Sequence, residues 1–307
     1  IRPFVTVREN AKSTRANLKE IFSKGGSEVL LRSTMNIEER KGFMDRDNLF
    51  GKEYYDPDGE ALPNYGDPTV RDSLRANNKV YLGSPYRLYA RYRFRYRQNV
   101  SFGITAEKDE GEEFFKGSQK NGFDYYSAHL FLRDIGRLKA VAIGDYQAQF
   151  GQGLTFWNGL AFSSKSSFTM NVKRNAVGLS PYTSVNENLY LRGGAATIEL
   201  VKNVELTGFF SRKAIDGNVS ALPTQNDSIG TQIQEVTFSS FQEDGCHRTN
   251  TQRRKSNGIN EQIIGGHARY KRSNFSIGAT AANVLYDAFL QPNTQPYSQF
   301  NFRGKTN

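Results

Sequence analysis

The sequence has no long apolar segment. No run approaches the roughly 18–20 apolar residues that a membrane-spanning helix needs, and mean hydropathy is −0.63. A single cysteine, Cys246, rules out a disulfide within the chain. There is one tryptophan against 16 tyrosines and 22 phenylalanines. Membrane helices and internal disulfides are therefore excluded, while an all-β protein rich in Tyr and Phe is not.

Motifs for catalysis and cofactor binding are also missing. The sequence contains no Ser/His/Asp set, P-loop or HExxH motif. The glycine-rich string FGQGL at 150–154 has Phe156 where a dinucleotide-binding loop needs its third glycine, and no helix signal follows it. We interpret it as a turn at the end of a strand. The sequence predicts a protein that is not an enzyme and has no cofactor.

Two short strings are candidate metal sites. DPDGE at 56–60 begins like a calcium loop, but Ala61 stands where glycine is required and no glutamate follows at the twelfth position. A polar turn is favoured over a loosely bound calcium ion. Cys246-His247 lacks a partner at metal-ligand spacing, since the other two histidines lie in separate predicted strands. We predict no metal site.

The segment 86–97 carries the clearest structural signal. Its apolar residues fall on one face of a period of two, and arginines dominate the other. The even positions are Leu88, Ala90, Tyr92, Phe94 and Tyr96, and the arginines are Arg87, Arg91, Arg93, Arg95 and Arg97. A row of arginines is too costly to bury in a dry core. No amphipathic helix is long enough to cover the apolar face, so we expect it to contact lipid. The pattern predicts a hairpin of a transmembrane β-barrel with a polar lumen.

The same alternation recurs along the chain. Further strands are predicted at 100–109, 123–134, 138–150, 194–200, 204–213, 261–271 and 274–285, with an opening strand at 27–36. In 138–150 we expect Ala140, Ala142 and Tyr146 on the lipid face and Asp145 on the lumen face. Only every second residue of such strands meets lipid, which explains the low mean hydropathy.

Connection lengths alternate between short and long. Tight turns are expected near 98–100, 135–137, 201–203 and 272–273, and long polar connections at 37–85, 110–122, 151–189, 214–260 and 287–297. Bacterial barrels have short periplasmic turns and long outer loops. VTFSSF at 236–241 is therefore placed in an extracellular hairpin, because a full span there would break the alternation. About nine spanning strands result, plus a start near Gln299, so we expect the sheet to be unfinished at Asn307.

Charged residues on the lumen face predict a ladder of ion pairs across the barrel interior. Its members are Arg87, Arg91, Arg93, Arg95, Arg97, Glu107, Asp109, Arg133, Asp145, Glu199, Glu205 and Lys213. The ladder would hold strands in register and narrow or plug the lumen; the alternative is an anion-selective lining. Nucleic-acid binding is disfavoured despite the net charge of +10, because arginines and tyrosines occupy opposite faces. The run Arg253–Lys255 is interpreted as a solvated loop, or else a contact to lipopolysaccharide or a partner.

Several strings resemble one known family. These are SEVLLRS (27–33), KVYLGSPYRLYARYRFRY (79–96), GITAEKDEGEEFF (103–115), FDYYSAHLFL (123–132), GDYQAQFGQGLTFWNGLAF (144–162), SPYTSVNENLYLRG (180–193), GCHRT (245–249) and QFNFRGK (299–305). They are similar to large outer-membrane barrels of the Bacteroidota that carry helix-hairpin-helix motifs ahead of the barrel. The resemblance implies a chain longer at both ends, with 1–25 as the tail of a periplasmic region and 26–307 as an incomplete barrel.

The leading hypothesis is a non-enzymatic component of the bacterial outer membrane, in contact with lipid and lipopolysaccharide. It would be structural, or would bind other outer-membrane or periplasmic proteins through its long loops. The first alternative is a channel with an arginine-lined lumen, for anions or for DNA uptake. The second is a soluble β-sandwich binder, which requires the Tyr- and Leu-rich faces to be buried protein core.

Overall fold

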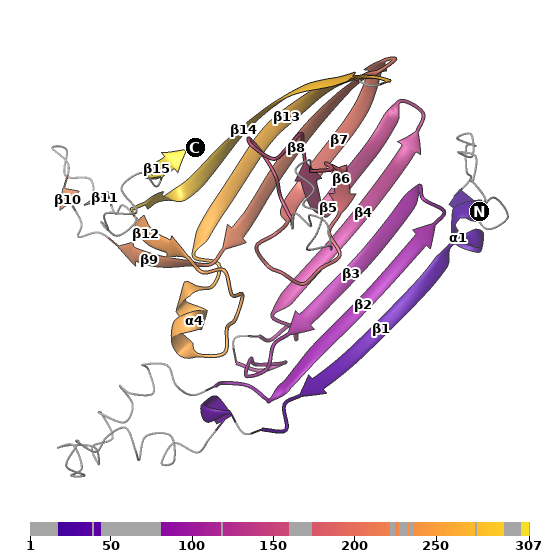
Figure 1. Ribbon diagram of the computed structural model, residues 1–307. Helices are drawn as coiled ribbons and strands as arrows, with labels where there is room; N and C mark the ends of the chain where they lie inside the picture. Colours follow the sequence, from indigo (N-terminus) through magenta and orange to yellow (C-terminus); the bar gives the residue numbers. More distant parts are fainter. Residues whose placement is uncertain are drawn as a thin grey trace, which may run out of the picture.

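The computed structural model of the protein describes residues 18–38, 40–43, 81–117, 119–159, 174–221, 225–226, 232–233, 236–273, 275–291 and 302–306. The described chain is mostly β, and one large, mainly antiparallel sheet dominates it (Figure 1). This confirms the all-β prediction at the level of the sheet. The calcium-loop-like string at 56–60 and the segment 1–17 lie outside the described residues.

Long strands make up most of the sheet. They are β1 (Gly26–Met35), β2 (Tyr86–Tyr96), β3 (Val100–Lys108), β4 (Tyr125–Ile135), β5 (Leu138–Gln149), β7 (Leu191–Val201), β8 (Val204–Ile215), β13 (Ile259–Arg272) and β14 (Phe275–Leu290). The shorter elements are α1 (Leu18–Lys24), η2 (Lys41–Phe43), β6 (Gly178–Pro181), β9 (Gly217–Ala221), β10 (Gln225–Asn226), β11 (Gln232–Ile233), β12 (Val236–Phe241), α4 (Asn250–Lys255) and β15 (Gly304–Thr306). Neither described α-helix has the length and apolar character needed to cross a membrane.

The nine long strands pair in chain order, each antiparallel to the next. The sheet remains open, with β1 at one edge and β14 towards the other, where only short strands follow. β12 adds a two-residue parallel contact to β14 and pairs antiparallel with β9. VTFSSF, the sequence of β12, therefore forms a short hairpin with β9 and does not cross the sheet. This agrees with the prediction that 236–241 lies in a hairpin and is not a full span.

Short and long connections lie at opposite ends of the sheet (Figure 1). The tight turns fall where they were predicted, after β2, β4, β7 and β13. Each of the four contains a residue with positive φ, namely Arg97 (49°), Gly136 (63°), Asn203 (72°) and Ser273 (35°), and glycine and asparagine tolerate this conformation best. The long connections at the other end carry η2, α4 and the β9–β12 hairpin (Figure 1). The run Arg253–Lys255 lies in the short helix α4 of the β12–β13 connection, so it is helical rather than irregular, but none of the residues of α4 is buried.

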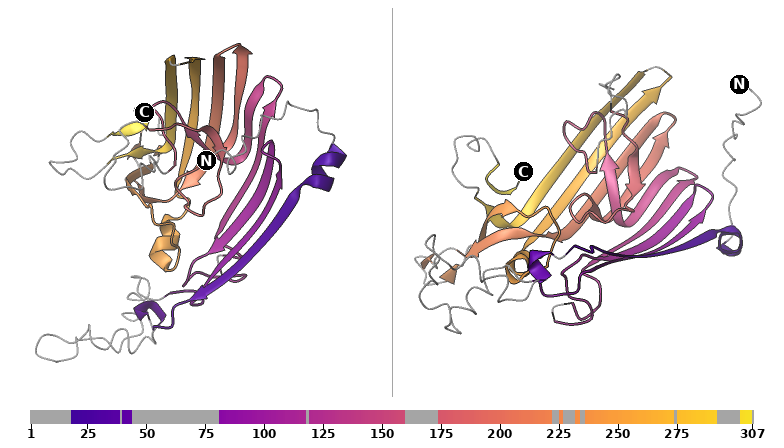
Figure 2. Two further views of the ribbon diagram at one scale, coloured as in Figure 1. Left: turned by 45° about the vertical axis from the view of Figure 1, so that its right-hand side comes forward. Right: turned by 60° about the horizontal axis from the view of Figure 1, so that its bottom comes forward.

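The sheet is strongly curved (Figure 2), and its two faces differ in chemistry. Along one register row, Val29, Tyr92, Ile104 and Ala128 share the outer face. Large apolar side chains on this face are 36% to 74% exposed. They include Val29, Leu31, Tyr92, Ile104, Tyr126, Ile143, Ile198, Leu206, Phe210, Ile264, Tyr270 and Ile277. Phe94 is an exception, because the ring of Phe22 in α1 lies 5.7 Å away and covers it.

The inner face is polar and covered. Thr105, Glu107, Ser127, His129, Thr197, Thr207, Ser211 and Lys213 lie on it and are at most 8% exposed. Hydrogen bonds between neighbouring strands satisfy several of them. Thr197 Oγ1 lies 2.9 Å from Thr207 Oγ1, and Ser101 Oγ lies 3.2 Å from His129 Nε2. The polar side of the sheet is thus the interior, and the apolar side is the exterior.

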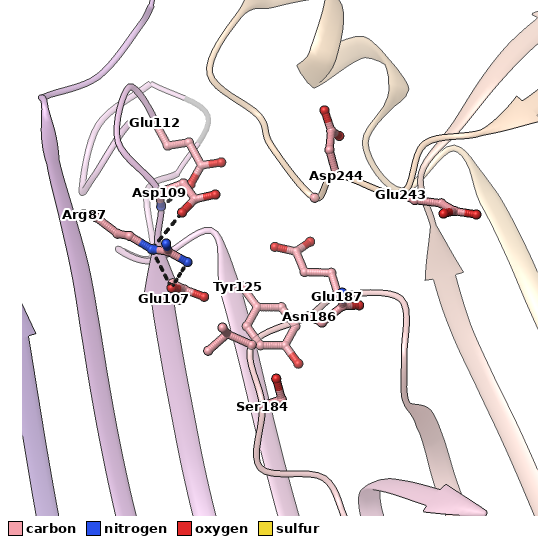
Figure 3. A pocket seen from close by; sticks show the side chains of 12 residues that line it. Arg87, Glu107, Asp109, Glu112, Tyr125, Ser184, Asn186, Glu187, Glu243 and Asp244 are labelled. Atoms are coloured by element: carbon pink, nitrogen blue, oxygen red, sulfur yellow. Dashed lines mark hydrogen bonds and ion pairs between the residues drawn. The ribbon is translucent and has the colours of Figure 1, made fainter. Parts of the chain in front are cut away.

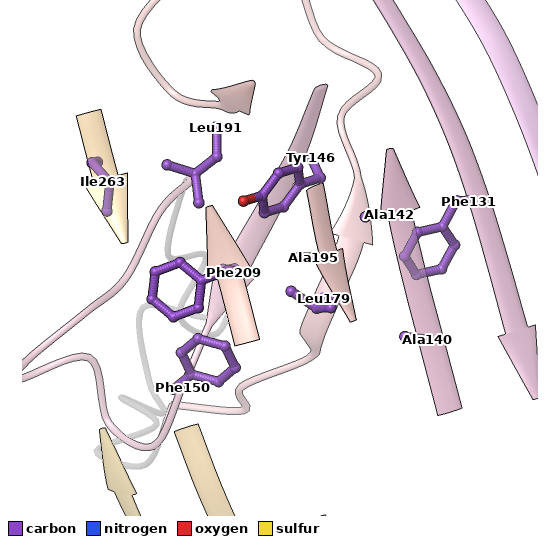
Figure 4. Packing of buried hydrophobic residues seen from close by; sticks show 11 residues of the cluster. Phe131, Ala140, Ala142, Tyr146, Phe150, Leu179, Leu191, Ala195, Phe209 and Ile263 are labelled. Atoms are coloured by element: carbon purple, nitrogen blue, oxygen red, sulfur yellow. The ribbon is translucent and has the colours of Figure 1, made fainter. Parts of the chain in front are cut away.

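A cluster of apolar residues fills the inner side over β5, where β6 and the residues after β5 fold back (Figure 4). Tyr146 is fully buried, and its hydroxyl donates to the carbonyls of Gly194 (3.4 Å) and Phe210 (2.7 Å). Ala140 and Ala142 pack in the same cluster. The prediction that these three residues face lipid was wrong: they face inwards, and Val141 and Ile143 pair across the outer face with Leu132 and Leu130.

We predict that Tyr146→Phe lowers the free energy of unfolding by about 1 kcal/mol, because a buried hydroxyl loses its hydrogen bonds. Denaturant unfolding in detergent measures this. Tyr126→Phe is the matched control, since its hydroxyl also bonds to backbone (Asn121 O, 2.7 Å) but is exposed, so water replaces the bond. An equal loss in both variants would contradict the inward, buried position of Tyr146.

Candidate functional site

The predicted charge ladder exists in part, with partners that the sequence did not reveal. Arg87 pairs with Glu107 (2.7 Å) and Asp109 (3.1 Å), both at the end of β3. Arg91 and Arg93, two further members of the predicted ladder, do not contact this acidic pair. Arg91 does lie opposite Thr105, but both arginines instead bind Glu28 of β1, at 2.8 Å and 2.5 Å.

The remaining acidic members of the ladder each contact a cation from a neighbouring strand. Glu199 pairs with Lys139 (2.7 Å) and Glu205 with Arg269 (2.6 Å). Asp145 pairs with Arg192 (2.7 Å) and also accepts a bond from the backbone N–H of Ala128. It lies at the seam where β4 and β5 stop pairing, beyond His129 and Gly144, and not on the open lumen face.

Four predicted members of the ladder make no ion pair across the interior within the described residues. Arg97 lies in the turn after β2 and contacts Glu20 of α1 at 3.5 Å. Arg95 is exposed on the inner face. Arg133 lies over the ring of Phe131 and donates to the carbonyl of Leu179. Lys213 donates to the carbonyl of Asn188 and lies over the ring of Tyr190.

A second site lies at the long-connection end, where five titratable residues from separate loops converge. We name it the histidine cluster: Glu112, Asp124, Glu187, Asp216 and His247. Glu112 and Asp124 belong to the β3–β4 connection, Glu187 to β6–β7, Asp216 to β8–β9, and His247 to β12–α4. The sequence offered only the Cys246-His247 dipeptide as a signal, because the other members are scattered over more than a hundred residues.

Hydrogen bonds hold His247 at the centre of this cluster. Its Nδ1 contacts Asp124, and its Nε2 lies 2.7 Å from Asp216 Oδ2. Its backbone N–H donates to Glu112 (2.8 Å), which also accepts from the backbone N–H of Asp109. Two residues later Thr249 caps α4 with a capping box, which fixes the end of the segment. One residue thus ties together three connections.

Burial and charge shift the titration of this cluster strongly. Burial alone would lower the pKa of His247, but its bonds to Asp124 and Asp216 outweigh burial and raise it to about 11. Burial, with the nearby Asp124 carboxylate, raises the pKa of Glu187 to about 9 and that of Glu112 to about 7. At neutral pH the histidine is a cation between two aspartates, and Glu187 carries a proton.

Two cavities flank the cluster. One, of about 260 Å³, is lined by carboxylates from facing connections and by Arg87 (Figure 3). Its acidic residues are Glu107, Asp109, Glu112, Glu187, Glu243 and Asp244. The other, of about 390 Å³, is lined by Asp124, Glu187, Asp216 and His247, by Tyr125, and also by Arg192, Arg212 and Lys213. The first cavity is therefore acidic and suits cations, whereas the second has both acidic and basic side chains in its lining.

A third cavity, at the short-turn end, has the opposite character. It measures about 680 Å³ and is lined by basic residues from β4, β13 and the segment before β6. Within the described residues no carboxylate pairs with three of them, Arg133, Arg174 and Lys271. His267 also lines it, with Nδ1 2.8 Å from Thr280 Oγ1. This cavity suits anions.

No family model matches the chain, and no curated protein or solved structure is similar to it at a significant level. The resemblance to helix-hairpin-helix barrel proteins stays a prediction.

We predict that the histidine cluster weakens at alkaline pH. A histidine whose pKa is higher in the folded state adds stability that is complete below about 6.5 and lost as the pH rises towards about 11. Glu187, with its raised pKa, likewise favours the folded loops at low pH. With EDTA present, hydrogen exchange in 242–249 should be less protected at pH 9.5 than at pH 6.5, after correction for intrinsic rates. Strand β8 is the internal reference.

His247→Gln should reduce the difference in hydrogen-exchange protection of 242–249 between pH 6.5 and pH 9.5, because glutamine does not titrate. Equal protection at both pH values in the unmodified protein would contradict the account of the cluster.

Proposed function

We propose that the chain forms most of a β-barrel in the bacterial outer membrane and acts as a structural or partner-binding component of the envelope. The observation that carries this proposal is the orientation of the sheet. Its exposed face carries large apolar side chains on all nine long strands, and its covered face is polar apart from the apolar cluster over β5. A soluble sheet buries its apolar face and exposes its polar one. An apolar surface this extensive needs a cover, and lipid supplies one along the whole sheet.

The edges of the sheet support barrel closure. In lipid every backbone N–H and C=O must be paired, so a membrane sheet has no free edge. The nine long strands alternate in direction, so β1 and β14 run the same way. An odd number of further strands is then needed to join them in antiparallel pairs, and the total is even. β15 pairs antiparallel with β14 at Leu285–Thr306 and Leu290–Gly304, where such a strand would lie.

The interior favours a structural or partner-binding role over free passage. Most acidic members of the ladder are neutralised by arginine or lysine, as a register-fixing ladder requires. The β5–β7 connection folds into the interior and packs with Phe131 and Phe209 (Figure 4). At the long-connection end, the histidine cluster joins loops into a cap. Loops held at the mouth of a barrel are suited to contact a partner.

The direct test compares two adjacent residues of β1. Val29 lies on the outer face and Leu30 on the inner face, opposite Arg91. We expect Val29→Glu to reduce membrane insertion of the full-length protein, with a depth-dependent cost below the about 2–4 kcal/mol that an arginine costs at the bilayer midplane. Leu30→Glu should insert normally, because its carboxylate would lie beside Arg91. Heat-modifiable migration after reconstitution reports insertion.

Two results would count against the membrane proposal. One is equal insertion of both variants. The other is a full-length protein that stays monomeric and folded without detergent, which would favour a soluble β-sheet binder.

A second candidate function is an anion-preferring pore, and the basic cavity of about 680 Å³ favours it. Planar-bilayer recording separates the two candidates. The leading proposal predicts no steady conductance, because the β5–β7 connection and the ladder fill the interior. Steady conductance with anion preference that Arg133→Glu abolishes would instead support the pore.

A further inference from the structure

Three members of the histidine cluster place ligand atoms close enough to share one ion. The carboxylates of Glu187 and Asp216 and the imidazole of His247 present atoms that all lie within 4.8 Å of one another. Asp216 Oδ2 is 2.7 Å from His247 Nε2. Each residue comes from a different connection, so the sequence shows no ligand spacing. The prediction that there is no metal site rested on that missing spacing.

The other ring nitrogen of His247 is held as metal-ligating histidines commonly are. Asp124 contacts Nδ1 and is itself fixed by Gln119, which donates to its second oxygen. A carboxylate at one imidazole nitrogen orients the ring and makes the other nitrogen a better ligand. Asp216 is oriented too, since its Oδ1 accepts from the backbone N–H of Asn257 at 2.8 Å.

The third candidate ligand, Glu187, lines the adjoining cavity. Glu187 makes no hydrogen bond or ion pair within the described residues, although its carboxylate is largely covered. Gly245 (φ +60°) allows this approach, because a Cβ there would lie 3.0 Å from Glu187 Cδ. A carboxylate that lines a cavity and has no partner of its own is available as a metal ligand.

We propose that His247 Nε2, Asp216 and Glu187 bind a divalent first-row transition-metal ion, with Asp124 as the positioning residue for the imidazole. One nitrogen and two carboxylates suit Zn²⁺ or its neighbours, whereas Ca²⁺ and Mg²⁺ prefer all-oxygen sites. On binding, the His247 Nε2 proton and the Glu187 carboxyl proton both leave to solvent, and the metal takes the place of the first between His247 and Asp216. The ion would join three connections at the long-connection end, whether or not the sheet lies in a membrane.

Titration calorimetry with Zn²⁺ tests the proposal, using full-length, tag-free protein in detergent after removal of metal by EDTA and dialysis. We expect one Zn²⁺ per chain, and at least a tenfold weaker affinity for Glu187→Gln. That variant should fold, because it removes a carboxylate that has no partner. Glu243→Gln is the matched control: Glu243 lines the neighbouring acidic cavity and is outside the ligand set.

Cys246→Ser should leave Zn²⁺ affinity unchanged, because Cys246 Sγ lies 3.5 Å from Asp109 and is not one of the three proposed metal ligands. Substituted Co²⁺ should accordingly show no thiolate charge-transfer band. The proposal is overturned if the unmodified protein binds no Zn²⁺ up to millimolar concentration. Equal affinity in the unmodified protein and Glu187→Gln would also overturn it.

Discussion

The outward orientation of the apolar face of the sheet is the constraint on which the rest of the structure depends, with the covered apolar inner face of β5 as the exception. A strand has only two faces, so a row such as Val29, Tyr92 and Ile104 on the outside fixes Glu28, Arg93 and His129 on the inside. Slipping one strand by a single residue would exchange the faces and place arginines on the apolar exterior. The register of every strand pair is therefore determined together.

The inner face then has to accommodate charge away from bulk water. Arginines form ion pairs with carboxylates of neighbouring strands, as Arg91 and Arg93 do with Glu28. Part of the face is also covered by the apolar cluster around Tyr146. Charged groups are also paired in the long connections, where His247 bonds to residues of the β3–β4 and β8–β9 connections from its own place in the β12–α4 connection. The outer face is mainly apolar, and the distinctive chemistry lies on the inner face and in the long connections.

Much of the sheet was predictable, because a period of two over ten residues is a strong local signal. The strands, the tight turns and the place of VTFSSF follow from it. The orientation of the two faces of β5 does not follow from the pattern, and the backbone shows why. Ala140, Ala142 and Tyr146 are apolar, but a connection from the interior covers them, and Gly144 has a left-handed φ of 90° beside the seam. Sequence alternation shows which residues lie on opposite faces of a strand, and only tertiary packing shows which of the two faces is covered.

The sites were less predictable than the strands, because their partners are distant in the chain. Arg87 finds Glu107 across one hairpin, and the sequence suggested that neighbourhood. Glu28, Arg192 and Arg269 were not foreseen, since each depends on a strand pairing or a seam that local pattern does not specify. The histidine cluster is the extreme case, with members from four connections and no repeated spacing.

The most direct test of the central claim is a spin-label scan along β4. The protein has a single native cysteine, so Cys246→Ser alone gives a cysteine-free background for spin labelling. Labels placed in turn at positions 126 to 133 of the full-length protein in lipid vesicles would be probed with oxygen and with a water-soluble nickel complex. The account predicts high oxygen accessibility at 126, 128, 130 and 132 and low accessibility at 127, 129, 131 and 133. Uniform accessibility, or the opposite phase, would contradict a sheet whose apolar face meets lipid.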